Sequence, residues 1–306
     1  MISNITKEIQ SLAMRKKIFL IVVISIGILT LSVLISFFIL MSSYNKLLHK
    51  TVADSLSNSA DKISDELKNI DAVSTSIVLD TSLQQMLGTV TDDPASVSIE
   101  LNSAIYNSLE SYFQQFRYNH LSYIMLDNEN LLMKPYMSTY IKSSRKMSDS
   151  LYKDLVESAQ NHQGRAVWVT KYSNSYGVFL VREIRRIQGV SLDTLGTLII
   201  NIDTQSLLEN SSHYSSQYGN TSYVLTEGDS VIETSGGLST SDVKQLRKKH
   251  SNAYEILGLS HGKYFVVKNQ IPLFEWDFYS LVPYNVVFNS LIATRILFFT
   301  ALAGSL

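Results

Sequence analysis

The sequence contains no cysteine, little glycine or proline, and few charged residues. The absence of cysteine excludes a disulfide framework, a thiolate zinc site and a cysteine nucleophile. Only 13 glycines and 4 prolines occur in 306 residues, which excludes a collagen-like or low-complexity chain. Charged residues make up 17% of the chain, below the roughly 25% that is typical of soluble domains. This shortfall is concentrated in an apolar segment near the N-terminus.

Acidic and basic residues nearly balance. With 27 acidic and 26 basic residues, the formal net charge is −1. Proteins that coat nucleic acid carry an excess of positive charge, so no nucleic-acid partner is expected in this region. The balance also argues against a disordered acidic tail.

The apolar segment runs from Ile18 to Met41 without a charged residue. As a helix it would span about 36 Å, more than the roughly 30 Å of hydrocarbon in a bilayer. A signal peptide has a shorter apolar core and a small-residue cleavage site, and the residues at 42–45 make a poor one. We therefore expect a transmembrane helix at residues 18–41.

Basic residues are more numerous before this segment than after it. Those before it are Lys7, Arg15, Lys16 and Lys17, and those that follow closely are Lys46 and Lys50. Because basic flanks favour the cytoplasmic side, we expect residues 1–17 to be cytoplasmic and residues from 42 onward to be extracellular.

A second apolar segment, residues 286–306, ends the sequence and is split by Arg295. The part after Arg295 would cover only about half a bilayer, and a helix that ended there would leave its last carbonyls unpaired in hydrocarbon. We therefore expect the start of a second transmembrane helix, truncated at Leu306, and a protein that continues beyond it.

Residues 42–285 would then form an extracellular domain that opens with a long helix. Its apolar positions follow helical spacing, at Leu48, Val52, Leu56, Ile63, Leu67, Ile70 and Ile77. The helix is expected to continue directly from the first span. Its apolar stripe is compatible with packing on its own domain and with a dimer seam.

Two groups of short strand-like segments follow, each containing a helix. After a break at 88–97 and a helix at 101–116, the first group has strands at 121–126, 131–133, 166–170, 178–187 and 195–203, and a helix at 148–160. The second has strands at 222–226, 230–234, 254–257, 263–270 and 276–282, and a helix at 240–250. The short turns are typical of antiparallel sheets, so the predicted class is α+β, with a distal module ending at 208 and a membrane-proximal module at 209–285.

Two stretches carry a family resemblance. VFLVREIRRIQGVSLDTLGTLIINIDTQSLL, at 178–208, resembles the distal sheet core of sensor domains in YesM-type histidine kinases, and FEWDFYSLVPYNVVF, at 274–288, resembles their last strand and entry to the second span. With the order of elements, nearly the whole chain is similar to a double Cache sensor, which has two PAS-like sheets. The resemblance implies a homodimeric receptor for a small molecule, such as a sugar or organic acid. It also implies a cytoplasmic histidine kinase beyond Leu306 that signals to a response regulator.

Other sequence features depart from the family. The run Arg165-Ala166-Val167-Trp168 is one residue too long for the Arg-x-Trp-aromatic element of amino-acid sensors, so amino-acid recognition is not implied. None of the six histidines lies in a phospho-accepting sequence of this family, and no nucleotide-binding glycine-rich loop occurs. Catalytic machinery is therefore not expected within residues 1–306. Two alternatives stay open: another output, of AraC or methyl-accepting type, and a membrane-anchored external binding protein or enzyme.

Arg182 is one candidate ligand-binding residue. It shares a strand face with Val178, Leu180 and Ile184 by period two. A charge on an apolar face needs a partner, which is either a ligand carboxylate or a side chain such as Asp203.

The other candidates are four aromatic residues and one acid. Trp168, Tyr123, Tyr172 and Tyr176 either line a distal pocket, where they would stack on a sugar or apolar ligand, or belong to the core. Asp203 ends a strand and is either a ligand-binding acid or a helix N-cap. No cofactor or metal is expected, since no histidines and carboxylates occur together at ligand spacing.

Overall fold

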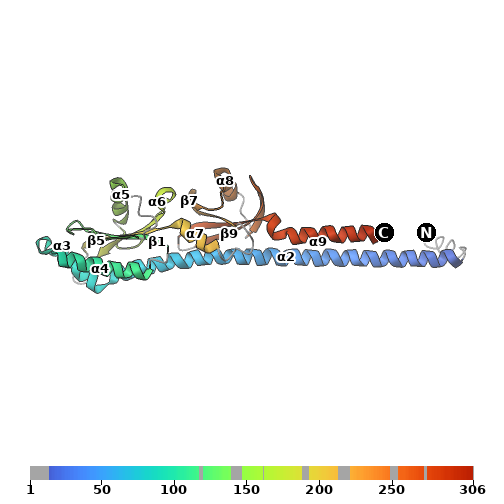
Figure 1. Cartoon of the computed structure of the whole chain (residues 1–306), viewed down its shortest axis with the longest axis horizontal. Coiled ribbons are helices and arrows are strands. Elements are labelled where there is room, and N and C mark those ends of the chain that lie inside the picture. The colour runs from blue at the N-terminus through green and yellow to red at the C-terminus, as the bar shows by residue number, and fades with distance from the viewer. Residues whose placement is uncertain are drawn as a thin grey trace. The chain divides into compact units, whose positions relative to one another are not determined.

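The structure is a computed structural model that describes residues 14–116, 120–138, 147–160, 162–187, 193–212, 221–248, 254–271 and 274–305. The chain divides into two compact units, Met1–Val52 and Ala53–Leu306. Figure 1 labels the helices and strands in chain order.

The first unit is formed by the N-terminal part of helix α2 (Met14–Leu79). Within the described residues, α2 is the one helix that is long and apolar enough to cross a membrane, from Ile18 onward, and its most apolar window buries none of its residues. A helix in the core of a soluble protein would bury such side chains. The predicted continuity of this segment with the long helix is confirmed.

In the second unit, α2 supplies the apolar stripe that the sequence predicted. Leu56, Ile63, Leu67, Ile70 and Ile77 are all buried. The stripe therefore packs on its own domain, and its use as a dimer seam stays a prediction.

Helix α3 (Thr81–Asp92) begins where Asp80 caps it, with Asp80 Oδ1 accepting from Leu83 N at 3.1 Å. It is followed by the short 3-10 helix η1 (Pro94–Ser96) and by α4 (Ile99–Phe116). The break predicted to begin at Gly88 begins only after Asp92, so that prediction was wrong. Gly88 is helical and leaves room for the guanidinium of Arg186, which would lie 3.2 Å from an added Cβ.

The distal sheet has five antiparallel strands in the order β2-β1-β5-β4-β3. Their bounds are β1 Leu121–Asp127, β2 Tyr136–Ser138, β3 Val167–Val169, β4 Val178–Arg185 and β5 Thr194–Ile202. The second strand was predicted at 131–133, which was wrong. Asn128 Oδ1 accepts from Asn130 N at 2.8 Å and holds a turn at 128–130. Beyond this turn, Met133 N donates to Asn102 Oδ1 of α4 at 3.2 Å, and the chain pairs with β1 only from Tyr136 onward.

The two faces of the distal sheet pack against different helices. On one face, residues such as Leu180 and Ile200 belong to a core that includes Leu67 and Ile70 of α2. The opposite face packs on α5 (Asp149–Ala159), while α6 (Ser173–Tyr176) connects β3 to β4. Figure 1 shows α5 and α2 on opposite sides of the strands.

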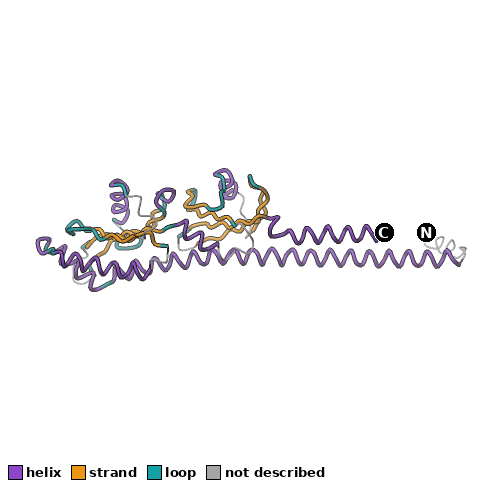
Figure 2. Tube along the Cα trace, viewed as in Figure 1, coloured by secondary structure: helices purple, strands orange, loops and turns teal. Residues whose placement is uncertain are grey.

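The proximal sheet repeats this order as β7-β6-β10-β9-β8, again antiparallel. Its strands are β6 Ser222–Glu227, β7 Ser230–Thr234, β8 Tyr254–Leu259, β9 Gly262–Ile271 and β10 Trp276–Pro283. Helix α7 (Thr204–Ser212) leads into it, and α8 (Thr240–Lys248) covers one face. The predicted α+β class with two antiparallel-sheet modules is confirmed (Figure 2).

Helix α9 (Tyr284–Ser305) follows β10 without an intervening loop. Its first turn packs on the proximal module, where the ring of Phe288 is buried 5.7 Å from that of Phe265 and 4.4 Å from that of Tyr284. A movement of β10 would therefore act directly on α9. The membrane crossing expected for 286–306 stays a prediction.

Candidate ligand site in the distal module

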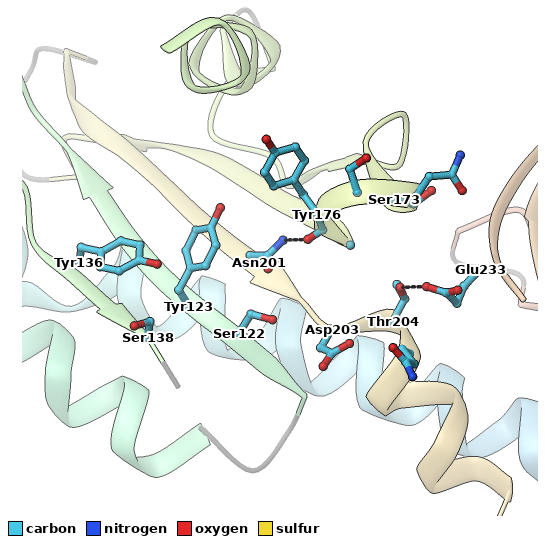
Figure 3. Close-up of a pocket in the computed structure, with 14 residues that line it drawn as sticks. Ser122, Tyr123, Tyr136, Ser138, Ser173, Tyr176, Asn201, Asp203, Thr204 and Glu233 are labelled. Atoms are coloured by element: carbon cyan, nitrogen blue, oxygen red, sulfur yellow. Dashed lines mark hydrogen bonds between the residues drawn. The ribbon is translucent and has the colours of Figure 1, made fainter. Parts of the chain in front are cut away.

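A cavity of about 340 Å³ lies at the end of the distal sheet that adjoins the proximal module. Its volume is within the range of small-molecule sites. Most of its lining side chains are polar (Figure 3). They are Ser122, Tyr123, Tyr136, Ser138, Ser173, Asn174, Ser175, Tyr176, Gly177, Asn201, Asp203, Thr204, Gln205 and Glu233.

Asn201 forms the centre of the cavity floor. It is in register with Tyr123 on one side and Phe179 on the other, so these three residues share the sheet face that packs on α5. Asn201 is only 3% exposed, and its Nδ2 donates to Tyr176 O at 2.8 Å and to Val178 O at 3.4 Å. These two bonds fix the orientation of the amide, and no described residue donates to its Oδ1. A buried carbonyl oxygen in this state can accept a hydrogen bond from a ligand.

Three tyrosine rings border the same space. Tyr123 of β1 lies 5.1 Å from Tyr136 of β2 between ring centroids, and Tyr176 comes from α6 (Figure 3). Burial raises the pKa of Tyr123, with smaller contributions from Tyr136 and Tyr176. The Tyr123 hydroxyl therefore stays protonated at physiological pH and remains a hydrogen-bond donor.

The remaining wall joins the two modules. Asp203 caps α7, its Oδ1 accepting from Ser206 N at 3.2 Å. Next to it, Thr204 Oγ1 donates to Glu233 Oε2 at 2.8 Å (Figure 3). Because Glu233 belongs to β7 of the proximal sheet, a ligand in the cavity would contact both modules.

Gly177 makes the close approach between α6 and β5 that shapes the cavity. Its φ is +81°, in the region that favours glycine, and an added Cβ would lie 2.3 Å from Ile202 O. A side chain at this position would push α6 away from the sheet.

The structure places three of the six predicted site residues, Tyr123, Tyr176 and Asp203, in the lining of the cavity. Asp203 is also the helix N-cap that the sequence suggested as its other role.

Arg182 lies on the opposite face of the sheet. Its Nη2 donates to Asp71 Oδ1 at 3.0 Å and its Nη1 to Thr75 Oγ1 at 2.7 Å, both on α2. Burial lowers the pKa of Arg182, and Asp71 opposes that shift. The partner that its apolar surroundings required is thus a side chain of α2, which sequence alone did not identify.

Tyr172 and Trp168 also lie outside the lining. The Tyr172 hydroxyl donates to Asp154 Oδ2 at 2.9 Å, and this carboxylate also pairs with Lys171 at 2.5 Å. Trp168 packs edge-on against Phe274 and Trp276, with centroid distances of 4.8 and 5.8 Å.

Trp168 belongs to a contact between the modules that we call the aromatic junction, consisting of Trp168, Phe274, Trp276, Thr170 and Glu227. Besides the ring contacts, Trp276 Nε1 donates to one Glu227 oxygen at 3.3 Å, and Thr170 Oγ1 donates to the other. The junction connects the distal edge strand β3 to the start of β10.

Sequence reasoning missed several lining residues, among them Asn201, Tyr136, Ser138 and Glu233. Asn201 carried a usable signal, since a polar amide inside the apolar run LIINID is unusual for a buried strand. Glu233 carried none, because its position depends on how two modules meet.

Among the described residues, no group of three or more histidines and carboxylates is arranged to hold a metal.

No family model matches the chain. Among curated proteins it is 20% identical over 248 residues to the sensor histidine kinase YesM of Bacillus subtilis, covering 80% of this chain and 41% of that protein. The chain thus spans less than half the length of this curated relative.

Solved structures of similar fold include the ligand-binding domain of the Campylobacter jejuni chemoreceptor Tlp3. Its complex with L-norvaline has a TM-score of 0.55 at 12% identity, covering 80% of this chain and 93% of that chain. The same domain with isoleucine bound gives 0.53 at 13% identity, covering 81% and 97%. The expected resemblance is confirmed: the chain has the two-module fold of double Cache sensor regions and is similar to the YesM sensor histidine kinase.

Proposed function

We propose that this chain is the extracellular ligand-sensing and transmembrane signalling part of a sensor histidine kinase. The observation that carries the proposal is the distal cavity, where the buried Asn201 leaves an oriented acceptor facing space of about 340 Å³. The Tlp3 domain, of similar fold, has been solved in complex with small molecules. A small-molecule ligand in the distal cavity is the simplest use of these features.

The membrane arrangement follows from the two apolar helices. The span at 18–41 would place the N-terminus in the cytoplasm, because basic residues precede it, and would leave the sheets outside the cell. Helix α9 would begin the second span and lead toward a cytoplasmic output.

Signalling would use the contacts that connect the cavity to α9. A ligand touching Asn201 and Glu233 would favour one arrangement of the two modules over another, and β10 would carry that change into α9. A ligand can shift such an equilibrium only by its difference in affinity for the two states. In a homodimer, the shift would alter how the membrane helices of the two copies meet, and thereby kinase activity toward a response regulator.

The chemoreceptor fold also fits a methyl-accepting output, and a transcription-regulating output would use the same sensor. The coding sequence beyond Leu306 distinguishes these outputs. An external binding protein or enzyme would have no cytoplasmic signalling domain there.

A ligand screen tests the sensing role directly. The full chain in lipid nanodiscs would be heated with sugars, organic acids, amino acids and amines, one at a time, and compounds that raise the unfolding temperature would be retained. Ser138→Trp, which fills the cavity from the end of β2, should abolish the shift. Ser103→Trp, on the exposed side of α4, should leave it intact. If no compound stabilises the chain, or if Ser138→Trp has no effect, the proposed binding site is wrong.

A further inference from the structure

Three tyrosine hydroxyls in the lining of the distal cavity have no hydrogen-bond partner among the described residues. They belong to Tyr123 of β1, Tyr136 of β2 and Tyr176 of α6. Figure 3 shows the three side chains around the same space as Asn201. Three separate elements of the distal module thus bring phenol groups to one cavity.

Other tyrosines of the distal module do have partners. The Tyr172 hydroxyl donates to Asp154 Oδ2 at 2.9 Å, and the Tyr112 hydroxyl donates to Asp80 Oδ2 at 3.0 Å. A tyrosine hydroxyl that leaves water usually finds such a partner. At the cavity, the group that completes the tyrosine hydroxyls would be a ligand.

The Tyr123 hydroxyl calls for an acceptor on that ligand. Burial raises the pKa of Tyr123, so its hydroxyl keeps the proton at physiological pH and can donate a hydrogen bond. A ligand that satisfies this donor must offer a lone pair. An ammonium group has only donors and cannot do so.

Asn201 and Glu233 call for a donor on the same ligand. The Asn201 amide is oriented by two bonds from Nδ2, at 2.8 and 3.4 Å, so its oxygen is an acceptor that no described residue satisfies. Glu233 accepts one bond from Thr204 Oγ1 and one from Thr234 N. A carboxylate has about four lone-pair positions, so Glu233 can accept further bonds. A ligand carboxylate at either place would put oxygen against oxygen.

Serine hydroxyls widen this mixture of donors and acceptors. Ser138, at the end of β2, and Ser173, at the start of α6, both line the cavity, and no described residue is hydrogen-bonded to either hydroxyl. A serine hydroxyl can donate or accept. The described lining contains no lysine, arginine or histidine to pair with a ligand carboxylate. The group that both donates and accepts without carrying charge is the hydroxyl.

The tyrosine rings suit a ligand with an apolar face as well. The ring centroids of Tyr123 and Tyr136 lie 5.1 Å apart, and together they present an apolar surface beside the polar groups. The C–H face of a sugar ring can pack on such a surface while its hydroxyls point to the polar groups.

Resting on the proposed sensing function, we propose that the distal cavity binds a neutral polyhydroxylated ligand, a sugar or a cyclic polyol. Its hydroxyls would donate to the Asn201 oxygen and to Glu233 and would accept from the tyrosine hydroxyls. Its C–H face would pack on Tyr123 and Tyr136.

Matched sets of probes test this class. Neutral pentoses, hexoses, disaccharides and inositols would be titrated into the full chain in lipid nanodiscs by isothermal titration calorimetry. Each hexose would be compared with its amino sugar and its uronate, which replace a hydroxyl by an ammonium or a carboxylate. At least one neutral compound should bind. Its charged counterparts should bind roughly tenfold more weakly, because each loses an acceptor or a donor and adds a charge that must be desolvated.

Two variants remove a hydroxyl and keep the ring. Tyr123→Phe and Tyr176→Phe should each weaken binding of the neutral ligand about three- to tenfold, the usual range for one neutral hydrogen bond. Tyr172→Phe is the matched control, since its hydroxyl bonds Asp154 outside the lining, and it should leave affinity unchanged.

Several outcomes would overturn the polyol class. They are failure of every neutral compound to bind at millimolar concentration, an amino sugar, uronate or amino acid that binds as tightly as the best neutral compound, and unchanged affinity in both tyrosine variants. Binding of a charged compound that Ser138→Trp abolishes would refute the polyol class but leave the proposed sensing site standing. If Ser138→Trp leaves that binding intact, both proposals are refuted.

Discussion

The distal and proximal sheets share one strand order but differ in what their outer faces carry. In the proximal module, Tyr279 and Leu281 of β10 are buried with Val224 and with Leu246 of α8, and this face forms a packed core. In the distal module, α5 covers Phe179 and Val181, but the same face continues to Asn201, which borders the cavity. The same topology therefore holds a cavity with polar walls in one module and a packed core in the other.

This difference suggests a division of roles. The distal module offers a place for a ligand, whereas the proximal module ends in β10 and passes directly into α9. The contacts between them, Thr204 with Glu233 and the aromatic junction, would then carry the effect of binding.

The largest expected effect is on the aromatic junction. Trp276 is 1% exposed, packs on Trp168 and donates to Glu227. Trp276→Ala should destabilise the chain by about 3–5 kcal/mol, as large-to-small changes in cores do. Trp168→Ala, at a partly exposed ring, should cost less. Urea unfolding of the full chain in nanodiscs measures both, and a loss below about 1 kcal/mol for Trp276→Ala would show that the modules do not depend on this contact.

Two glycines with positive φ allow a comparison between the cavity and an ordinary turn, namely Gly177 beside the cavity and Gly228 in the β6–β7 turn. Gly177→Ala combines an unfavourable positive φ with a clash against Ile202 O, and should cost more than about 2 kcal/mol and abolish ligand binding. Gly228→Ala, in the β6–β7 turn, has a positive φ but no neighbour within 4 Å, so it should cost only about 1 kcal/mol. Equal losses in the two variants would contradict the close approach assigned to Gly177.

Arg182 distinguishes the two faces of the distal sheet. Arg182→Met removes the bonds to Asp71 and Thr75 and should lower stability by about 1–3 kcal/mol. Ligand affinity should stay within twofold of the parent, because Arg182 faces away from the cavity. A loss of affinity of tenfold or more would show that Arg182 contributes to ligand binding.

The smallest expected effect on stability comes from changing Asp242, in the first turn of helix α8 on the proximal sheet. Hydrogen bonds from Ser239 and Ser260 lower the pKa of Asp242 in the folded state. Because a lowered pKa stabilises the fold above the unfolded value of roughly 4 and loses that contribution as pH falls, Asp242→Asn should cost about 1 kcal/mol at pH 7 and less at pH 3. The same difference in unfolding midpoint at both pH values would contradict this role.

Much of the fold could be predicted because it follows from local patterns of apolar and polar residues. The apolar spacing of α2 and the strand runs on either side of short turns give the two-module order, and β7 matches its predicted bounds. The errors fell where side chains override a pattern. Leu131 to Met133 looked like a strand, but Met133 N donates to Asn102 Oδ1 of α4, and pairing with β1 starts only at Tyr136. Gly88 looked like a break, but α3 continues through it beside Arg186.

The candidate site was harder to predict because it depends on contacts between distant segments. The strand face of Arg182 was foreseen, yet its partner Asp71 lies far away in sequence on α2. Tyr123 and Tyr176 were chosen as aromatic residues and do line the cavity. Trp168 was chosen for the same reason but packs in the junction, since composition does not say which side of an edge strand meets a second module.

The central claim is that ligand binds the distal cavity and that the proximal module responds. Hydrogen exchange of the full chain in nanodiscs, with and without the tightest-binding compound from the screen, tests it most directly. The account predicts slower exchange at 173–178 and 199–205, which border the cavity, together with a change along 276–283. Protection confined to 254–271, with none at the cavity, would contradict it.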